Sequence, residues 1–396
     1  MLEKPTAASI VPAPAALKAA RQLVPDVAAA ADEIERSCRL PDDLVAALHE
    51  ARLFRLLLPA AFGGEEVEPL VFLQVMEEIA KADASTAWCL CQTAVCTVFS
   101  VLLDPEVGAE IFHDRGAVLA MGHGADARAV AVEGGYRVTG NWSFASGGHN
   151  ATWLGAPCAE YRADGAPRTD AAGRPSARTV LFRASMAPLT RVWNVLGLRG
   201  TGSDAYGVSD LFVPARHSFD PGALAELPGR RPLYLYPPNS FWGGGFASIA
   251  LGIARSMLDA LTDLATQKTP RGASRPMANV AAIQSLIARS EAALTSSRLF
   301  LHDAFARSWR AALAGEVDLA QRIAIRLAAS HTIQQAKAVV DECYDAAGTT
   351  AVFASQPFER RFRDMHSVTQ HLHGRASHFE LVGQFMLGMT PNTTFL

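Results

Sequence analysis

Four histidines lie close together near the C-terminal end of the chain, between Met365 and His378. Imidazole has an ordinary pKa near neutrality, so these residues could donate or accept a proton in a reaction at physiological pH. Within one helix, residues seven positions apart share a face, so His366 would pair with His373, and His371 with His378. A metal site is not expected, because no carboxylate completes a ligand set. The competing interpretation is that some of the four are ordinary structural residues.

A second stretch, Gly140–Gly148, combines aromatic, hydroxyl and glycine residues directly after a strand-like run. Glycines let a ligand come close to the backbone, aromatic side chains can lie along a flat ring, and hydroxyls can bind its polar edge. We therefore expect Trp142 and Phe144 to line a ring, and Ser143 and Ser146 to form hydrogen bonds with it. The competing interpretation is that Trp142 and Phe144 belong to an ordinary strand core.

A glycine-flanked loop, Gly197–Ser203, offers similar chemistry. Thr201 and Ser203 supply hydroxyls, and Arg199 supplies a forked cationic donor. For Arg199 the competing interpretation is a surface salt bridge. Together the two stretches are typical of a site for a flat, largely apolar heterocycle with one polar edge, such as a flavin.

The bulk composition is that of a folded protein with room for two or three domains. The chain has 396 residues, 49% of them hydrophobic and 19% charged, with a formal net charge of -3. No basic face suggests a nucleic-acid partner, and no apolar run approaches the roughly 18 residues of a membrane span. The N-terminus lacks the apolar core of a secretory signal, which predicts a cytoplasmic protein with free thiols. Cys89, Cys91 and Cys96 lie in an apolar helical stretch, where we expect core packing and no zinc.

Hydrophobic periodicity divides the chain into three regions. We expect an N-terminal helical domain over residues 1–115, a small antiparallel β-barrel or sandwich over 116–232, and a C-terminal four-helix bundle over 233–396. The fold class is thus mainly α with a central β-domain. Helices are expected over residues 15–36, 69–82, 87–103, 247–266, 279–314 and 319–347, with the last helix inside 355–388, and a hairpin turn at 133–135.

Four motifs, in this order, resemble the acyl-CoA dehydrogenase superfamily. Trp142–Gly147 is similar to its flavin turn, Gly197–Ser203 followed by Leu211–Pro214 to its second flavin-side loop and closing strand, and Arg360–Asp364 to the start of its last core helix. The resemblance covers nearly the whole chain. It implies an acyl-CoA dehydrogenase-like fold in which Trp142, Ser143, Phe144, Ser146, Arg199, Thr201 and Ser203 bind a flavin.

The catalytic base of the dehydrogenases is missing. In that superfamily a glutamate removes an α-proton from an acyl thioester. The two positions where the resemblance places such a glutamate hold Leu372 and Trp242 in this chain. The flanking histidines resemble instead the two-component flavin-dependent monooxygenases, such as the oxygenase components of 4-hydroxyphenylacetate and phenolic-steroid hydroxylases and dibenzothiophene monooxygenase. In those relatives a histidine lies beside the flavin C4a edge, and His371 is the best match.

This resemblance implies a reaction and its partners. Reduced FMN, or FAD, would come from a separate flavin reductase, since no Gly-x-Gly-x-x-Gly follows a strand in this chain. The reduced flavin would react with O2 to a C4a-hydroperoxide, with Ser146 holding N5–H and His371 donating a proton. The product would be a hydroxylated small aromatic or heterocyclic substrate.

Further residues would surround the site. His123, between two glycines, would meet the substrate, although a plain loop role is an alternative. Trp88 and Gln92, on the apolar helix, and Trp242 would line the substrate pocket; for an aromatic on such a helix, core packing is the competing interpretation.

Arg271 and Arg275 precede a long helix, in a loop that resembles the one that carries an arginine to the flavin of a neighbouring subunit. If so, the site is completed in an oligomer, which in this fold is usually a homotetramer. The alternative is a cationic surface loop.

Two other functions stay open from the sequence. One is α,β-dehydrogenation of an acyl thioester by a dehydrogenase or oxidase whose base lies elsewhere. The other is a non-catalytic relative that kept the flavin fold, which would show no affinity for flavin.

Overall fold

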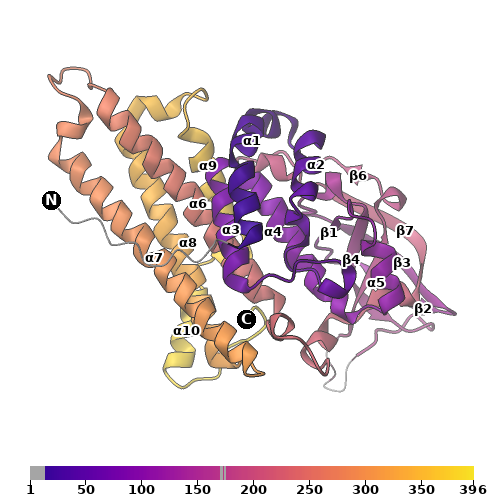
Figure 1. The fold of residues 1–396 in the computed structure, drawn as a ribbon. Coiled ribbons are helices and arrows are strands. Elements are labelled where there is room, and N and C mark those ends of the chain that lie inside the picture. The colour runs from indigo at the N-terminus through magenta and orange to yellow at the C-terminus, as the bar shows by residue number, and fades with distance from the viewer. Residues whose placement is uncertain (1–13, 170–172, 174) are drawn as a thin grey trace.

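A computed structural model of the protein describes residues 14–169, 173 and 175–396 (Figure 1). The N-terminal region is helical, as predicted, and its third helix has the expected bounds. That helix starts with Pro69, which lacks an N–H that would be unpaired in the first turn anyway. The helices of this region are α1 (Ala15–Ser37), α2 (Asp42–Glu50), α3 (Pro69–Ala82), α4 (Ala84–Val98) and α5 (Pro105–Phe112).

The central helix of this region is α4. Asp83 caps it, because its Oδ1 accepts hydrogen bonds from the Thr86 backbone N–H at 2.6 Å and from the Thr86 hydroxyl at 2.7 Å. Every residue of α4 is buried except Gln92. Gln92 is thus the one residue of this apolar helix that is not fully buried, and its side chain is a polar amide.

The stretch Ala84–Leu102 is long and apolar enough to cross a membrane, by length and composition alone, which the sequence analysis did not anticipate. However, 78% of its apolar window is buried inside the protein. Packing against neighbouring helices and strands therefore accounts for its apolar composition.

The central region folds into one curled eight-stranded sheet with the order β6-β7-β3-β2-β4-β5-β8, and β1 lies beside β4. The predicted hairpin joins β2 and β3. The prediction of an antiparallel barrel or sandwich holds for most strand pairs, but β4 pairs in parallel with both β1 and β2. The far edge of β3 is occupied by β7, so β4 adds beside β2 and runs in the same direction. The strands are β1 (Leu119–Met121), β2 (Arg128–Val132), β3 (Gly135–Trp142), β4 (Trp153–Tyr161), β5 (Ala177–Arg183), β6 (Leu189–Thr190), β7 (Ala205–Pro214) and β8 (Ser218–Phe219).

Long helices return after the sheet and pack on the side of α3 and α4 away from the strands (Figure 1). The first of them starts nine residues before the expected position 247, because three glycines let it pass very close to its neighbours. A Cβ at Gly245 would lie 2.5 Å from the Cys91 Sγ, and one at Gly244 would lie 2.5 Å from the Phe305 ring. The helices are α6 (Pro238–Gln267), α7 (Ala281–Leu313), α8 (Leu319–Ala347), α9 (Glu359–Gln370) and α10 (His378–Met386).

The histidine-rich segment is not one helix. It breaks after Gln370 into a short turn before α10 begins, so the predicted pairing of histidines by helix face is wrong. His366 contacts Asp341 on α8, with Nε2 and Oδ1 2.8 Å apart. His371 and His373 lie in the turn, where their rings stack at 5.4 Å.

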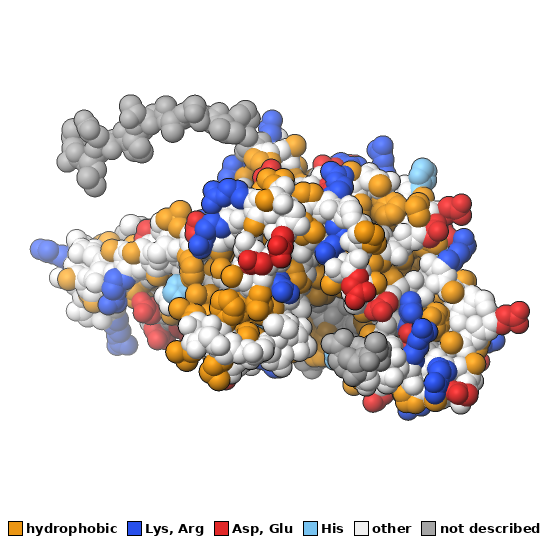
Figure 2. Space-filling model, turned by 90° about the horizontal axis from the view of Figure 1, so that it is seen from below, with side chains coloured by type: hydrophobic (Ala, Val, Ile, Leu, Met, Phe, Trp, Pro, Cys, Tyr) orange, Lys and Arg blue, Asp and Glu red, His pale blue; other side chains and the backbone are white. Residues whose placement is uncertain are grey.

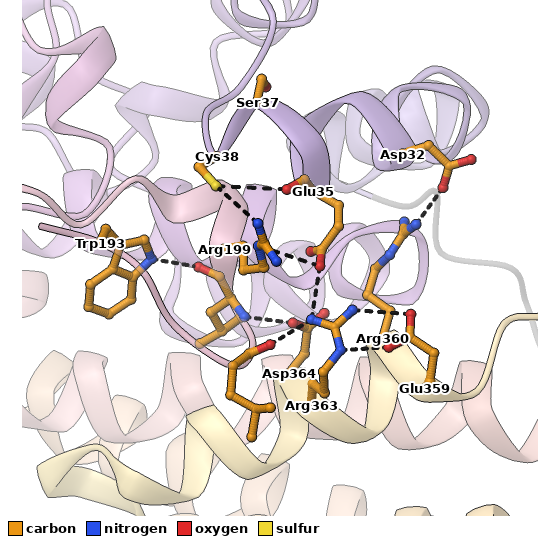
Figure 3. Close-up of polar contacts among 12 residues, drawn as sticks. Asp32, Glu35, Ser37, Cys38, Trp193, Arg199, Glu359, Arg360, Arg363 and Asp364 are labelled. Atoms are coloured by element: carbon orange, nitrogen blue, oxygen red, sulfur yellow. Dashed lines mark hydrogen bonds and ion pairs between the residues drawn. The ribbon is translucent and has the colours of Figure 1, made fainter. Parts of the chain in front are cut away.

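The loop Gly197–Ser203 is fixed to α9 and α1 by a group of ion pairs and hydrogen bonds (Figure 3). The Arg363 guanidinium donates to the Leu196 carbonyl at 2.6 Å and pairs with Glu35 at 2.8 Å. The Leu198 backbone N–H donates to the Asp364 carboxylate at 2.6 Å. The Arg360–Asp364 motif therefore positions the loop that carries the site hydroxyls.

Burial raises the pKa of Asp364 from its ordinary 3.8 to about 7. The folded protein then keeps a proton on this group at pH values where the unfolded chain has lost it. Stability from this group is therefore present at about pH 4 and is lost as the pH rises to about 7.

We predict that the D364N variant, which keeps an oxygen for the Leu198 N–H, removes this pH dependence. Denaturant unfolding at pH 5 and pH 8 should show the wild type losing stability relative to D364N at the higher pH. A stability difference that is the same at both pH values would contradict the assignment.

Candidate active site

A cluster of aromatic rings lies where α4, α6 and the turn after α9 meet. Trp88 on α4 and Phe246 on α6 are parallel, with ring centroids 3.9 Å apart and an interplanar angle of 5°. The His371 ring meets both edge-on, at 4.6 Å from Phe246 and 5.4 Å from Trp88. We call Trp88, Trp242, Phe246, His371 and His373 the ring cluster.

Phe246 was not among the residues predicted from the sequence. It follows directly after Gly243–Gly245, in the first half of α6, where nearly every residue is buried. Three consecutive glycines in a helix interior are costly, since glycine is a poor helix former. That run was the available signal that α6 approaches another element closely at this point.

Three hydroxyls form a chain beside the ring cluster. The Ser146 and Ser203 oxygens are 2.7 Å apart, and so are those of Ser203 and Thr201. The Thr201 hydroxyl donates to the Leu198 carbonyl at 2.8 Å, and the Trp88 indole N–H donates to Ser146 at 3.2 Å. The structure thus brings together three residues that were predicted from two separate stretches; we call Ser146, Ser203 and Thr201 the hydroxyl chain.

The direction of the hydroxyl chain follows from its two ends. An indole N–H can only donate and a carbonyl can only accept, and each hydroxyl has one proton. Thr201 gives its proton to Leu198, so Ser203 must donate to Thr201 and Ser146 must donate to Ser203. Ser146 therefore keeps one free acceptor lone pair and has no proton left to donate.

His371 is held as a neutral ring. Burial, followed by the charges of Arg375 and Arg326, lowers the pKa of His371 from 6.5 to about 4. Its Nδ1 accepts the backbone N–H of His373 at 3.3 Å, so its proton is on Nε2. At neutral pH it can donate a hydrogen bond from Nε2, but it is a weak base.

Trp242 and Gln92 contact each other at the edge of the ring cluster. The Trp242 indole N–H donates to the Gln92 side-chain oxygen at 2.8 Å, and the Trp242 ring lies 6.3 Å from that of His373. This hydrogen bond leaves the Gln92 amide hydrogens without a partner among the described residues. The structure thus brings Trp242, from a distant part of the sequence, to the part of α4 that carries Trp88 and Gln92.

Phe144 is exposed at the surface of the turn. Its side chain is 62% exposed, its backbone has a φ of 61°, and its ring meets Trp193 at 5.9 Å. Ser143 is exposed next to it and pairs through its backbone with His123, whose side chain is exposed as well. These residues form a partly apolar surface beside the hydroxyl chain.

Two predicted flavin contacts lie elsewhere. Trp142 is fully buried inside the sheet, where it stacks on Tyr206 at 5.3 Å and donates its N–H to the Pro157 carbonyl at 2.9 Å. Side chains alternate along a strand, so Trp142 points inward while the residues after it reach the surface. Arg199 lies 3.7 Å from Glu35, which is the salt-bridge alternative (Figure 3). We therefore leave both out of the proposed site.

Arg271 and Arg275 are exposed in the connection between α6 and α7. This connection lies at the end of the bundle that is far from the sheet (Figure 1).

The site lacks a carboxylate at both dehydrogenase positions. Leu372 lies between the two stacked histidines, and Trp242 is hydrogen-bonded to Gln92. In the described part of the chain, no three His, Cys, Asp or Glu residues are grouped to hold a metal ion. The polar groups that contact the ring cluster, among the described residues, are hydroxyl, amide and imidazole groups and the guanidinium of Arg326, which lies 2.8 Å from His373 Nδ1.

The geometry agrees with comparisons to known proteins. Residues 15–103 match the N-terminal domain of acyl-CoA dehydrogenases, and residues 244–375 match their C-terminal domain. Indole-3-acetate monooxygenase from Pseudomonas putida is 30% identical, over 92% of this chain and 91% of that protein. The oxygenase component of the FADH2-dependent resorcinol hydroxylase from Rhizobium sp. is 29% identical, over 97% of this chain and 98% of that protein. The crystal structure of 3-HSA hydroxylase from Rhodococcus sp. RHA1 superimposes with a TM-score of 0.88 at 24% identity, covering 97% of this chain and 99% of that one.

The chain belongs to the acyl-CoA dehydrogenase family. Within that family it belongs to the branch of flavin-dependent monooxygenases, as the histidine segment predicted. The prediction of an acyl-CoA dehydrogenase-like fold is confirmed as well.

The lowered pKa of His371 leads to a prediction about stability. The unfolded chain binds a proton at about pH 6.5, whereas the folded protein binds it only near pH 4. Stability from the neutral ring is therefore present above pH 6.5 and is lost as the pH falls toward 4.

We expect the wild type to lose stability relative to the H371Q variant between pH 7 and pH 5, as measured by denaturant unfolding. H366Q is a suitable control, because His366 is paired with Asp341. If wild type and H371Q show parallel pH profiles, His371 is not held neutral.

Proposed function

We propose that this protein is the oxygenase component of a two-component flavin-dependent monooxygenase that hydroxylates a small aromatic or heterocyclic substrate. The observation that carries the proposal is the one-directional hydroxyl chain, which leaves Ser146 only an acceptor lone pair to offer a ligand. The neutral His371 lies against the same Trp88 that donates to Ser146. The names of the relatives support it, because they are monooxygenases and hydroxylases of aromatic compounds.

The residues present fit a reduced flavin. Reduced flavin carries a hydrogen on N5, whereas oxidised flavin has only a lone pair there. Ser146 has a free lone pair and no proton to donate, so it favours the reduced form. The exposed ring of Phe144 and the half-buried ring of Trp193 offer apolar surface for a flat ring system. Ser143 adds an exposed hydroxyl at the same turn.

When bound, a reduced flavin supplies the electrons that activate O2. Ser146 would accept a hydrogen bond from N5–H and so keep that proton on N5. Trp88 and Ser203 fix the orientation of the serine hydroxyl. His371 would donate from Nε2 to oxygen atoms that gain negative charge. The ring cluster would exclude water, which strengthens both hydrogen bonds.

The ring cluster also suggests how an aromatic substrate is bound. Trp88 and Trp242 supply aromatic surface, and the Gln92 amide hydrogens can bind a polar group on the ring. His123 lies at the exposed end of the first strand, where it could meet the substrate. Because the pKa of His371 is lowered to about 4, this residue suits the role of donor better than that of base for a phenol.

A separate flavin reductase would supply the reduced flavin to this chain in the cytoplasm. We also propose a homotetramer in which Arg271 or Arg275 reaches the flavin phosphate of a neighbour.

The lower face of the molecule carries a patch of hydrophobic side chains (Figure 2). The segment at the end of α10, on this side of the molecule, exposes Met386, Leu387 and Met389.

The main test mixes the protein, under O2, with reduced FMN or reduced FAD and a panel of phenols and indoles. We expect hydroxylated product, with hydrogen peroxide as the uncoupled by-product. Reduction of bound FAD by an acyl-CoA, without hydroxylation, would establish the dehydrogenase alternative. Failure to bind either flavin would establish the non-catalytic one.

Replacing Ser146 by Ala should lower the yield of hydroxylated product per reduced flavin by roughly tenfold, about the value of one lost hydrogen bond. The flavin should then release more hydrogen peroxide. S209A is the matched control, since Ser209 is an exposed serine on β7. An unchanged yield in S146A would remove Ser146 from the mechanism.

A further inference from the structure

Arg326 on α8 is a buried cation without a carboxylate partner among the described residues. Its side chain is 2% exposed. One guanidinium nitrogen, Nη1, lies 2.8 Å from Nδ1 of His373, and Nη2 donates to the Phe395 carbonyl. A Cβ at Gly243 would lie 3.2 Å from Nη1, so the glycine of α6 leaves room for the guanidinium.

A buried charge without a counter-ion costs several kcal/mol, so its placement needs a reason. Hydrophobic packing alone would favour an apolar residue at this position in α8. The hydrogen bond to His373 is such a reason, because His373 belongs to the ring cluster of the proposed site.

The hydrogen bond fixes the state of His373. Burial lowers the pKa of Arg326 to about 10, so it is still charged at neutral pH and can only donate. His373 Nδ1 must therefore accept, which requires a neutral ring with its proton on Nε2. This Nε2–H has no partner among the described residues.

The other groups around His373 act in the same direction. The titratable ones are His378 from α10 and His371 from its own segment, and Arg375 of that segment acts on His371. Among the described residues, α6 contributes the uncharged rings of Trp242 and Phe246, and behind Trp242 lies the uncharged Gln92 of α4. Burial and the charge of Arg326 both lower the pKa of His373.

We propose that Arg326 is a positioning residue that keeps His373 as a neutral ring with its Nε2–H presented to the site. His373 then becomes a second imidazole donor, stacked 5.4 Å from His371. The Phe395 carbonyl holds the guanidinium in place from the other side. The role of His373 in the reaction rests on the proposed monooxygenase function, whereas the state of its ring does not.

The first experiment measures the ring directly, without flavin. NMR spectra of ¹⁵N-histidine-labelled wild type are compared with those of the labelled variants H373N and H371N. The signals that are missing from each variant's spectrum assign the corresponding ring. In the wild type we expect an unprotonated Nδ1 and a protonated Nε2 for His373, unchanged from pH 8 to pH 5. A proton on Nδ1, or titration of the ring within this range, would overturn the proposal.

The variants R326M and R326K separate positioning from packing. In R326M the pKa of His373 should rise by at least about one unit, because the cation is gone, and the tautomer should become mixed. R326K keeps the positive charge and a hydrogen-bond donor, so His373 should have the wild-type tautomer in this variant. R326K can still be compared with the wild type if R326M does not fold. R322M, one turn earlier on α8 and not buried, is the matched control. Identical His373 spectra in R326M and wild type would refute the role of Arg326.

The second experiment follows the product yield per reduced flavin from pH 5 to pH 8. In R326M the product yield should begin to fall at a pH about one unit higher than in the wild type. R326K should recover the wild-type pH profile. If the wild type forms no product at all, the proposed function fails while the NMR result still decides the state of His373. If product forms with the same pH profile in R326M and wild type, the positioning role fails alone.

Discussion

A serine hydroxyl has a single proton, and the proposed site depends on which group accepts the hydrogen bond that Ser146 donates. The Trp88 N–H at one end and the Leu198 carbonyl at the other allow only one direction for the hydroxyl chain between them. The same Leu198 is held by its own N–H to Asp364, so α9 fixes the far end of the chain. Four distant parts of the sequence must therefore be in place before Ser146 becomes an acceptor.

The second constraint is that no carboxylate side chain of the described residues forms a hydrogen bond or ion pair with the ring cluster. Dehydrogenases of this family need a carboxylate to remove a proton, and this chain has Leu372 and Trp242 at those positions. In their place are His371 and His373, which burial and nearby arginines keep neutral. Neutral imidazoles in a dry site donate hydrogen bonds well but remove protons poorly. The same fold can thus activate oxygen instead of a carbon–hydrogen bond.

Most of the fold could be predicted from the sequence, because long helices have strong periodicity and α3 and α8 begin and end where it indicated. The sequence could not predict that β4 lies beside β2, because strand order depends on which edge is free. It also could not show that the histidine segment breaks after Gln370, since no proline or glycine marks that point.

The sequence by itself determined which chemical groups are available: the hydroxyls of two glycine-flanked stretches, the histidines and the missing carboxylate. Their residue types and order were enough to predict the family and the flavin. The tertiary structure alone decided which groups meet. It buried Trp142 in the sheet, paired Arg199 with Glu35, and placed Phe246 and Arg326 against the histidines. Proton positions depend on partners contributed by other helices and loops, and such long-range contacts leave no local pattern in the sequence.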